Sequence, residues 1–135
     1  MKTSFYFRTL IYEILQNSPI SAIITGNIYN GNRPANSSKE DITLHYLSGI
    51  NRPFQEATLL IHIYFADIES IDGSYPIEDT ERGGFLAALA CNILDGIETG
   101  AYMTYIEDQT SFAVEDATTP QHCIQIKLTV TQANI

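Results

Sequence analysis

Acidic residues occur in this chain as adjacent pairs, which makes them the first candidates for chemistry. Paired carboxylates can serve general acid–base catalysis or bind a divalent cation. Each pair falls, however, at a predicted turn or at the end of a predicted element, where solvated charges also belong. We therefore predict surface charges rather than a catalytic or metal site at Glu40-Asp41, Glu78-Asp79, Glu107-Asp108 and Glu115-Asp116.

The histidines and one calcium-like segment do not complete a motif either. His45, His62 and His122 have no Ser or Cys nucleophile in a recognisable turn, so they do not predict a triad. The run from Asp67 to Gly73 resembles a calcium loop superficially, but Ile71 occupies its fifth position. The chain has no P-loop, dinucleotide-binding fingerprint or HExxH motif. The sequence therefore predicts no enzyme, no cofactor and no metal.

The two cysteines, Cys91 and Cys123, are isolated in the sequence. They form no CxxC pair and have no histidine cluster beside them, so they indicate neither a disulfide framework nor a zinc site. We predict two reduced, partly buried thiols.

Composition favours one acidic globular domain over residues 1–135. Hydrophobic residues make up 44% of the chain and charged residues only 17%, against about 25% in an average domain. Something other than water is therefore expected to cover part of the surface. The 7 Lys and Arg against 16 Asp and Glu give a net charge of −9, which argues against binding a phosphate backbone.

No targeting or membrane segment is recognised in the sequence. The stretch from Met1 to Arg8 lacks the apolar region of a signal peptide. No run approaches the roughly 18 apolar residues that a membrane-spanning helix needs. We expect a protein of the cytosol, unless it becomes part of a particle, with no membrane partner.

The spacing of apolar residues predicts the elements that position these side chains. Apolar residues recur at helical spacing in two segments and alternate in several others. The predicted elements are a helix over 3–16, a short helical turn after Ser18, a brief strand over 27–29, an exposed loop over 30–41, strands over 42–47 and 55–67, a linker over 68–77, a helix over 78–97, strands over 102–106 and 111–115 around a turn at Glu107-Asp108-Gln109, and a strand over 123–131.

This order predicts an α+β fold. The expected architecture is an antiparallel (mixed) β-sheet with an N-terminal helix and a second helix packed on one face, in the order α-β-β-β-α-β-β-β. Both faces of the 55–67 strand are substantially apolar, so that strand is expected to be central or covered on both sides.

The helix over 78–97 is uncharged on all sides between Arg82 and Asp95. A helix that is apolar all round is normally buried all round. Either the first helix or a neighbouring subunit could cover its second side. The predicted core stripe is Phe85, Leu86, Leu89, Ile93 and Ile97, and the opposite side carries the small residues Gly84, Ala87, Ala88 and Cys91.

Two arginines in predicted turns add to these four small residues as candidate interface residues. Arg33 and Arg52 each precede a proline. Arginine in exposed turns is enriched at interfaces, but for each arginine taken alone the sequence favours a solvated turn.

The order of elements resembles a known family. An N-terminal helix leads to Ile23-Ile24-Thr25-Gly26-Asn27-Ile28-Tyr29, then to a loop with Arg33-Pro34 and to Glu40-Asp41-Ile42, followed by the strand pair 42–47 and 58–67, a helix and closing strands. This pattern is similar to the small tail terminator and tail-completion (head–tail joining) proteins of long-tailed bacteriophages and prophages.

The resemblance implies a non-enzymatic virion assembly protein. It would be made in the bacterial host cytoplasm and form a homo-oligomeric ring, typically a hexamer, at the junction between tail tube and head. Its partners would be itself, the tail tube and neck or connector proteins, and DNA would pass without specific binding. Low charge, an all-round apolar helix and an acidic balance agree with such a role.

Two other function classes remain open from the sequence. One is a small acidic protein-interaction module, such as an immunity or accessory protein that binds one basic partner. The other is a small hydrolase with a carboxylate cluster that includes Glu78 and Asp79. A ring-forming virion protein would be recognised by a multiple-subunit mass.

Overall fold

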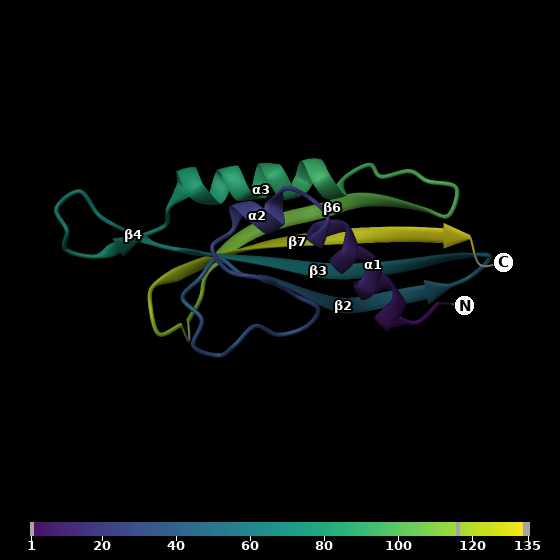
Figure 1. The fold of residues 1–135 in the computed structure, drawn as a ribbon, viewed down its shortest axis with the longest axis horizontal. Coiled ribbons are helices and arrows are strands. Elements are labelled where there is room, and N and C mark those ends of the chain that lie inside the picture. Colours follow the sequence, from purple (N-terminus) through teal and green to yellow (C-terminus); the bar gives the residue numbers. More distant parts are fainter. Residues whose placement is uncertain (1, 116, 134–135) are drawn as a thin grey trace.

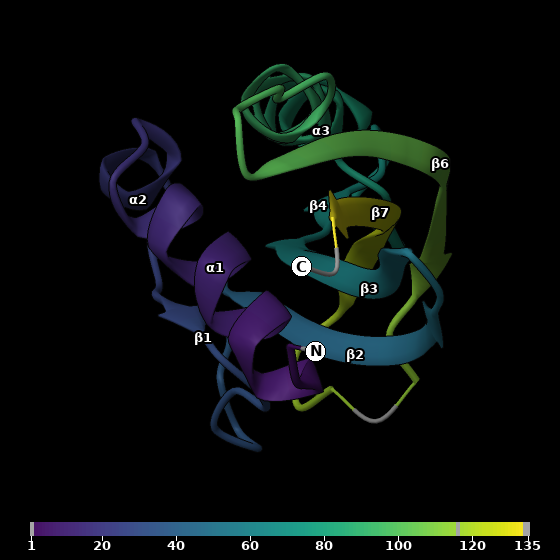
Figure 2. The same ribbon diagram turned by 90° about the vertical axis from the view of Figure 1, so that its right-hand side faces the viewer.

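The computed structural model describes residues 2–115 and 117–133. A five-stranded mixed sheet with the order β1-β2-β3-β7-β6 forms its centre, and the two longer helices lie over one face (Figures 1 and 2). The predicted α+β class is confirmed. The elements are α1 Ser4–Gln16, α2 Ile20–Ile23, β1 Ile28–Tyr29, β2 Ile42–Asn51, β3 Phe54–Ala66, β4 Ile68–Glu69, β5 Pro76–Ile77, α3 Thr80–Leu94, β6 Tyr102–Ala113 and β7 Gln121–Ala133.

The antiparallel pair of β3 and β7 forms the longest ladder within the sheet. It runs without interruption from Phe54 opposite Ala133 to Ala66 opposite Gln121. β2 pairs with the other side of β3 and continues to Asn51, beyond its predicted end. The short β1 is parallel to β2, so the sheet is mixed. The alternation of apolar residues in β3 places Leu59, Ile61, Ile63 and Phe65 on the helix side, where they are buried.

Helices α1 and α3 bury one stripe each against this face. The side chain of Thr3 caps α1 by accepting a hydrogen bond from the Tyr6 amide at 3.3 Å. α1 then contributes Phe7, Ile11 and Leu15 to the core, at helical spacing. α3 contributes Leu86, Ala90 and Leu94 to the same core.

α3 is turned differently from the prediction. Phe85, which the sequence places in the core stripe, is 49% exposed, and Leu89 and Ile93 are half-buried. The buried positions start instead at Gly83, against the Phe65 ring. A glycine there lets the helix backbone lie close to the ring, which sets the rotation of the helix. The predicted core stripe is therefore partly wrong.

β6 is one strand rather than the two strands that the sequence predicts. The expected turn at Glu107 is a β-bulge, where the register with β7 shifts between Ile106 and Asp108. The long β7 offers backbone partners on both sides of the bulge, so the chain continues instead of reversing. Three predicted strands after α3 thus become two.

The predicted linker over 68–77 contains a small hairpin of its own. β4 and β5 pair only with each other, as a two-stranded sheet. Figure 1 shows this hairpin standing away from the body of the molecule, beyond the start of α3. We call residues 68–77 the arm.

Candidate interaction surfaces

The first acidic pair, Glu40-Asp41, is buried rather than solvated. Glu40 is 9% exposed and Asp41 is 1% exposed. The prediction of surface charges is therefore wrong for this pair. Both residues lie at the end of the 30–41 loop and hold it to neighbouring segments.

Glu40 forms a bidentate ion pair with Arg82 of α3. Arg82 donates from Nε and from Nη2 to the two carboxylate oxygens, at 2.7 Å each, and the Thr25 amide donates to Oε1 at 3.2 Å. The hydrogen bond from Arg82 lowers the pKa of Glu40 below its ordinary value of 4.5, against the opposing effect of burial. The pair ties the start of α3 to the end of the loop that leads into β2.

Asp41 and Arg33 belong to a second polar network. The Asp41 carboxylate accepts a hydrogen bond from the Asn27 amide at 3.0 Å and one from the Ser37 hydroxyl. Arg33 donates to the Gln121 side chain at 2.8 Å and lies 3.8 Å from Asp41. The Asp41 carboxylate is therefore bound by groups of its own chain and is not a free surface charge.

Arg33, a candidate interface residue, does not project into solvent. Its guanidinium stacks over the Tyr64 ring, 3.6 Å from the centroid, and its side chain is 12% exposed. The loop arginine is folded back onto the sheet. Only the small exposed part of the Arg33 side chain could contact a partner.

The two residues of the second acidic pair, Glu78 and Asp79, have different roles. Asp79 is the N-cap of α3 and accepts a hydrogen bond from the Arg82 amide at 3.1 Å. Glu78 lines a groove beside that helix. The pair does not converge on one point, as a carboxylate mechanism would require.

The remaining two pairs lie in and after β6. Glu107, the bulge residue, forms an ion pair with Lys127 at 3.6 Å, and Asp108 beside it is exposed. Glu115 is exposed, whereas its neighbour Asp116 lies outside the described residues. Within residues 2–115 and 117–133, no group of three or more His, Cys, Asp or Glu side chains is suited to hold a metal ion.

Two of the three histidines meet on the face of the sheet that the helices leave uncovered. The rings of His45 and His62 are 5.6 Å apart, and His62 Nε2 lies 2.9 Å from the Gln125 side-chain oxygen. Burial, and then the neighbouring His62, lowers the pKa of His45. His122 is separate and lies 2.6 Å from Asp67.

Both cysteines are free thiols. Cys123 is buried, which raises its pKa to about 12. Cys91 is half-buried, and burial raises its pKa as well. Both thiols therefore stay protonated near neutral pH, the unreactive form.

The other candidate interface residues lie on two different parts of the surface. Arg52 is exposed in the connection between β2 and β3. Gly84 and Ala88 are exposed on α3, whereas Ala87 and Cys91 are half-buried. The four residues of α3 thus share one side of the helix, as the sequence indicates, and that side is only partly covered by the chain.

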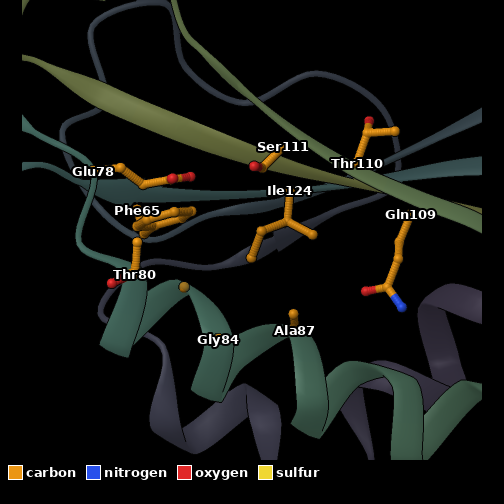
Figure 3. Close-up of a pocket in the computed structure, with 10 residues that line it drawn as sticks. Phe65, Glu78, Thr80, Gly84, Ala87, Gln109, Thr110, Ser111 and Ile124 are labelled. Atoms are coloured by element: carbon orange, nitrogen blue, oxygen red, sulfur yellow. The ribbon is translucent and has the colours of Figure 1, made fainter.

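A groove of about 330 Å³ runs between α3 and β6. Figure 3 shows Gly84 and Ala87 on the helix side, Gln109, Thr110 and Ser111 on the strand side, and Phe65 and Ile124 between them. Apart from Glu78, its walls are small or uncharged, and its floor is apolar. The groove is a place where another side chain could pack, without groups arranged for catalysis.

Most of the exposed large hydrophobic side chains form two sets at opposite ends of the molecule, and the others lie on α3 (Phe85) and β6 (Met103, Tyr105 and Phe112). One set belongs to the arm: Ile68, Ile71, Tyr75 and Ile77. A second set lies where the start of α1 meets the β2–β3 connection, and we call this surface the hairpin end. Its exposed apolar residues are Phe5, Leu47, Ile50 and Phe54.

Sequence reasoning did not find these two surfaces. It treated the arm as a linker, although four of its ten residues are large and apolar. That content was the available signal, because true linkers are usually polar. No local pattern in the sequence predicts the hairpin end, because it is formed by the start of α1 and the start of β3, which are far apart in the sequence.

Comparison with models of protein families finds no family that matches the chain. A search of curated proteins finds no matching relative either. None of the helices in the described part of the chain is long and apolar enough to cross a membrane. The function therefore has to be inferred from the surfaces themselves.

Proposed function

We propose that this protein is a structural assembly protein of a tailed phage or prophage, a ring-forming tail terminator or tail-completion component at the tail tube–head junction. It acts by contacts with copies of itself, with the tail tube and with neck proteins, and not by catalysis. The proposal joins the family resemblance of the sequence to the surfaces described above.

The observation that carries the proposal is the exposed apolar surface at both ends of the molecule. Ile71 is fully exposed, and Phe5 and Phe54 are more than half exposed. Monomeric proteins seldom leave several large apolar side chains together in water, and such patches mark sites of protein contact. A subunit with two such patches can contact two neighbours at once.

The charge of the chain supports the same role. A net charge of −9 disfavours binding to a phosphate backbone. A subunit of a ring through which DNA slides benefits from this repulsion, because a bound strand would be retarded.

Purified tail tubes provide the direct test. The full chain is mixed with tubes that lack their terminal protein, and the products are viewed by negative-stain electron microscopy. We expect density at one end of each tube and no further elongation after tube protein is added. Tubes that stay bare and continue to grow would contradict the proposal.

A small acidic interaction module is the second candidate, and the acidity of the arm region favours it. From Pro53 to Glu81 the chain has no Lys or Arg. In this case the arm would contact one basic protein, and the chain would stay monomeric or dimeric and leave tail tubes bare. The tail-tube experiment therefore separates the two candidates.

A further inference from the structure

We propose that the arm of one copy docks onto the hairpin end of a second copy, so that subunits join head to tail. The inference rests on the proposed function in one respect, since it takes a second copy of this chain as the partner. It goes further in naming which two surfaces meet and in predicting that they are different surfaces.

The arm is held in shape before it meets a partner. Asp72 accepts hydrogen bonds from the hydroxyls of Ser70 and Ser74, at 2.7 and 2.6 Å, and from the Ser74 amide at 3.0 Å. The Ser70 amide donates to the Tyr75 carbonyl at 2.9 Å and closes the turn. An isolated two-stranded hairpin is marginal in water, so these bonds preserve a surface that its own chain leaves uncovered.

The apolar residues of the arm point to a macromolecular partner. Ile71, at the tip, is fully exposed, and Tyr75 is 58% exposed. Branched and aromatic side chains of this size are typical anchors of protein interfaces. A projection with such a tip would fit a complementary hollow on its partner.

The hairpin end offers a hollow with the matching chemistry. A groove of about 300 Å³ lies between the start of α1 and the end of β2, with Lys2 and Ile50 in its lining. Lys2 and Gln55 exchange two hydrogen bonds, at 2.9 and 2.7 Å, which join the start of the chain to β3. Phe5 and Phe54 are exposed on the elements that flank this junction.

The charges of the two surfaces are opposite. The arm carries Glu69 and Asp72, within a stretch of the chain that has no cation. The first twelve residues carry Lys2 and Arg8 and no acid, and the β2–β3 connection adds Arg52; Glu56 is the nearest acid on β3. Opposite charges favour contact between the arm and the hairpin end, and like charges disfavour contact between two arms.

The positions of the two surfaces decide the kind of assembly. The arm and the hairpin end lie at opposite ends of the long axis of the molecule (Figure 1). A contact between two different surfaces is heterologous, and repeated contacts of this kind close into a ring when the rotation between subunits allows it. This is the arrangement that a ring protein needs.

Complementation between two defective variants tests the inference. Ile71→Asp damages the arm and Phe54→Asp damages the hairpin end, and both sites are exposed enough to leave the fold intact. Each variant alone should associate at least about twentyfold more weakly than wild type, as for loss of an interface anchor. Mixed together, they should form a one-to-one dimer, because one intact arm and one intact hairpin end remain.

Native mass spectrometry of the two variants and of their mixture provides the measurement. Phe112→Asp, the same change at a partly exposed residue of β6 that belongs to neither surface, is the matched control and should assemble like wild type. Unchanged far-ultraviolet circular dichroism and urea midpoints verify folding.

The outcomes separate this inference from the proposed function. Wild type that assembles while either variant assembles equally well would overturn the docking of the arm and leave the ring function standing. Variants that are monomeric alone and also when mixed would overturn the head-to-tail pairing. A wild-type chain that is monomeric in solution and on tail tubes would overturn both.

Discussion

At the scale of single residues, the fold depends on two buried carboxylates that look like surface charges in the sequence. Glu40 and Asp41 each need a cation or several donors, because an unpaired buried charge is costly. Arg82 lies 42 residues away from Glu40, and Gln121 lies 88 residues away from Arg33. Pairings over such separations leave no local pattern, so they could not be predicted.

The Glu40–Arg82 pair gives a prediction for stability. We expect Arg82→Met to lower the free energy of unfolding by about 2–3 kcal/mol, because it leaves Glu40 buried without its cation. The estimate is below the range for fully buried pairs because one third of the Arg82 side chain is exposed. Urea unfolding at neutral pH measures it, and an equally stable variant would show that the pair is not needed.

The same pair predicts a pH dependence. Glu40 has a lower pKa in the folded state than its ordinary 4.5, so its contribution is complete above 4.5 and is lost as the pH falls through the folded pKa. The stability difference between wild type and Glu40→Gln should therefore be largest at neutral pH and shrink below 4.5.

Glu13→Gln is the matched control for this titration, because Glu13 is exposed on α1. Its stability difference from wild type should be small at all pH values. A Glu40→Gln difference that grows on acidification would contradict the assigned direction of the pKa shift.

At the scale of elements, neighbouring glycines of α3 have opposite environments. A Cβ at position 83 would lie 2.6 Å from the Phe65 ring, whereas a Cβ at position 84 would meet nothing within 4 Å. Gly83→Ala should therefore destabilise the fold by about 1–3 kcal/mol through overpacking. Gly84→Ala should stabilise it by about 0.5–1 kcal/mol, since alanine is the better helix former.

Thermal or urea unfolding of the two variants checks this pair, each variant serving as the control for the other. Equal effects would mean that α3 is not rotated as described. If the small side of α3 also contacts a neighbouring subunit, Gly84→Ala should in addition weaken assembly while it stabilises the monomer.

The periodic elements could be predicted from the sequence, and the irregular ones could not. β3 and β7 alternate over many residues, and α1 has a clear apolar stripe, so their positions are confirmed. β6 was divided at Glu107 because a bulge and a turn use similar polar residues. The arm was missed because its strands are two residues each, too short for any periodicity.

At the scale of the whole molecule, two exposed apolar surfaces, the arm and the hairpin end, lie at opposite ends of the long axis (Figure 1). The acidic arm and the more basic hairpin end should attract one another at long range and then bury their apolar side chains. Added salt should therefore slow association measurably while affecting dissociation less. Stopped-flow light scattering at several salt concentrations measures this, and a rate that does not change with salt would contradict the role of charge.

Self-association is the feature on which the proposed function depends most directly. Native mass measurement of the full chain over a wide concentration range tests it. We expect a closed species of several copies of the 15.0-kDa chain, with six as the expected number. A mass of 15.0 kDa at every concentration, in a chain that also leaves tail tubes uncapped, would contradict the assignment as a ring-forming assembly protein.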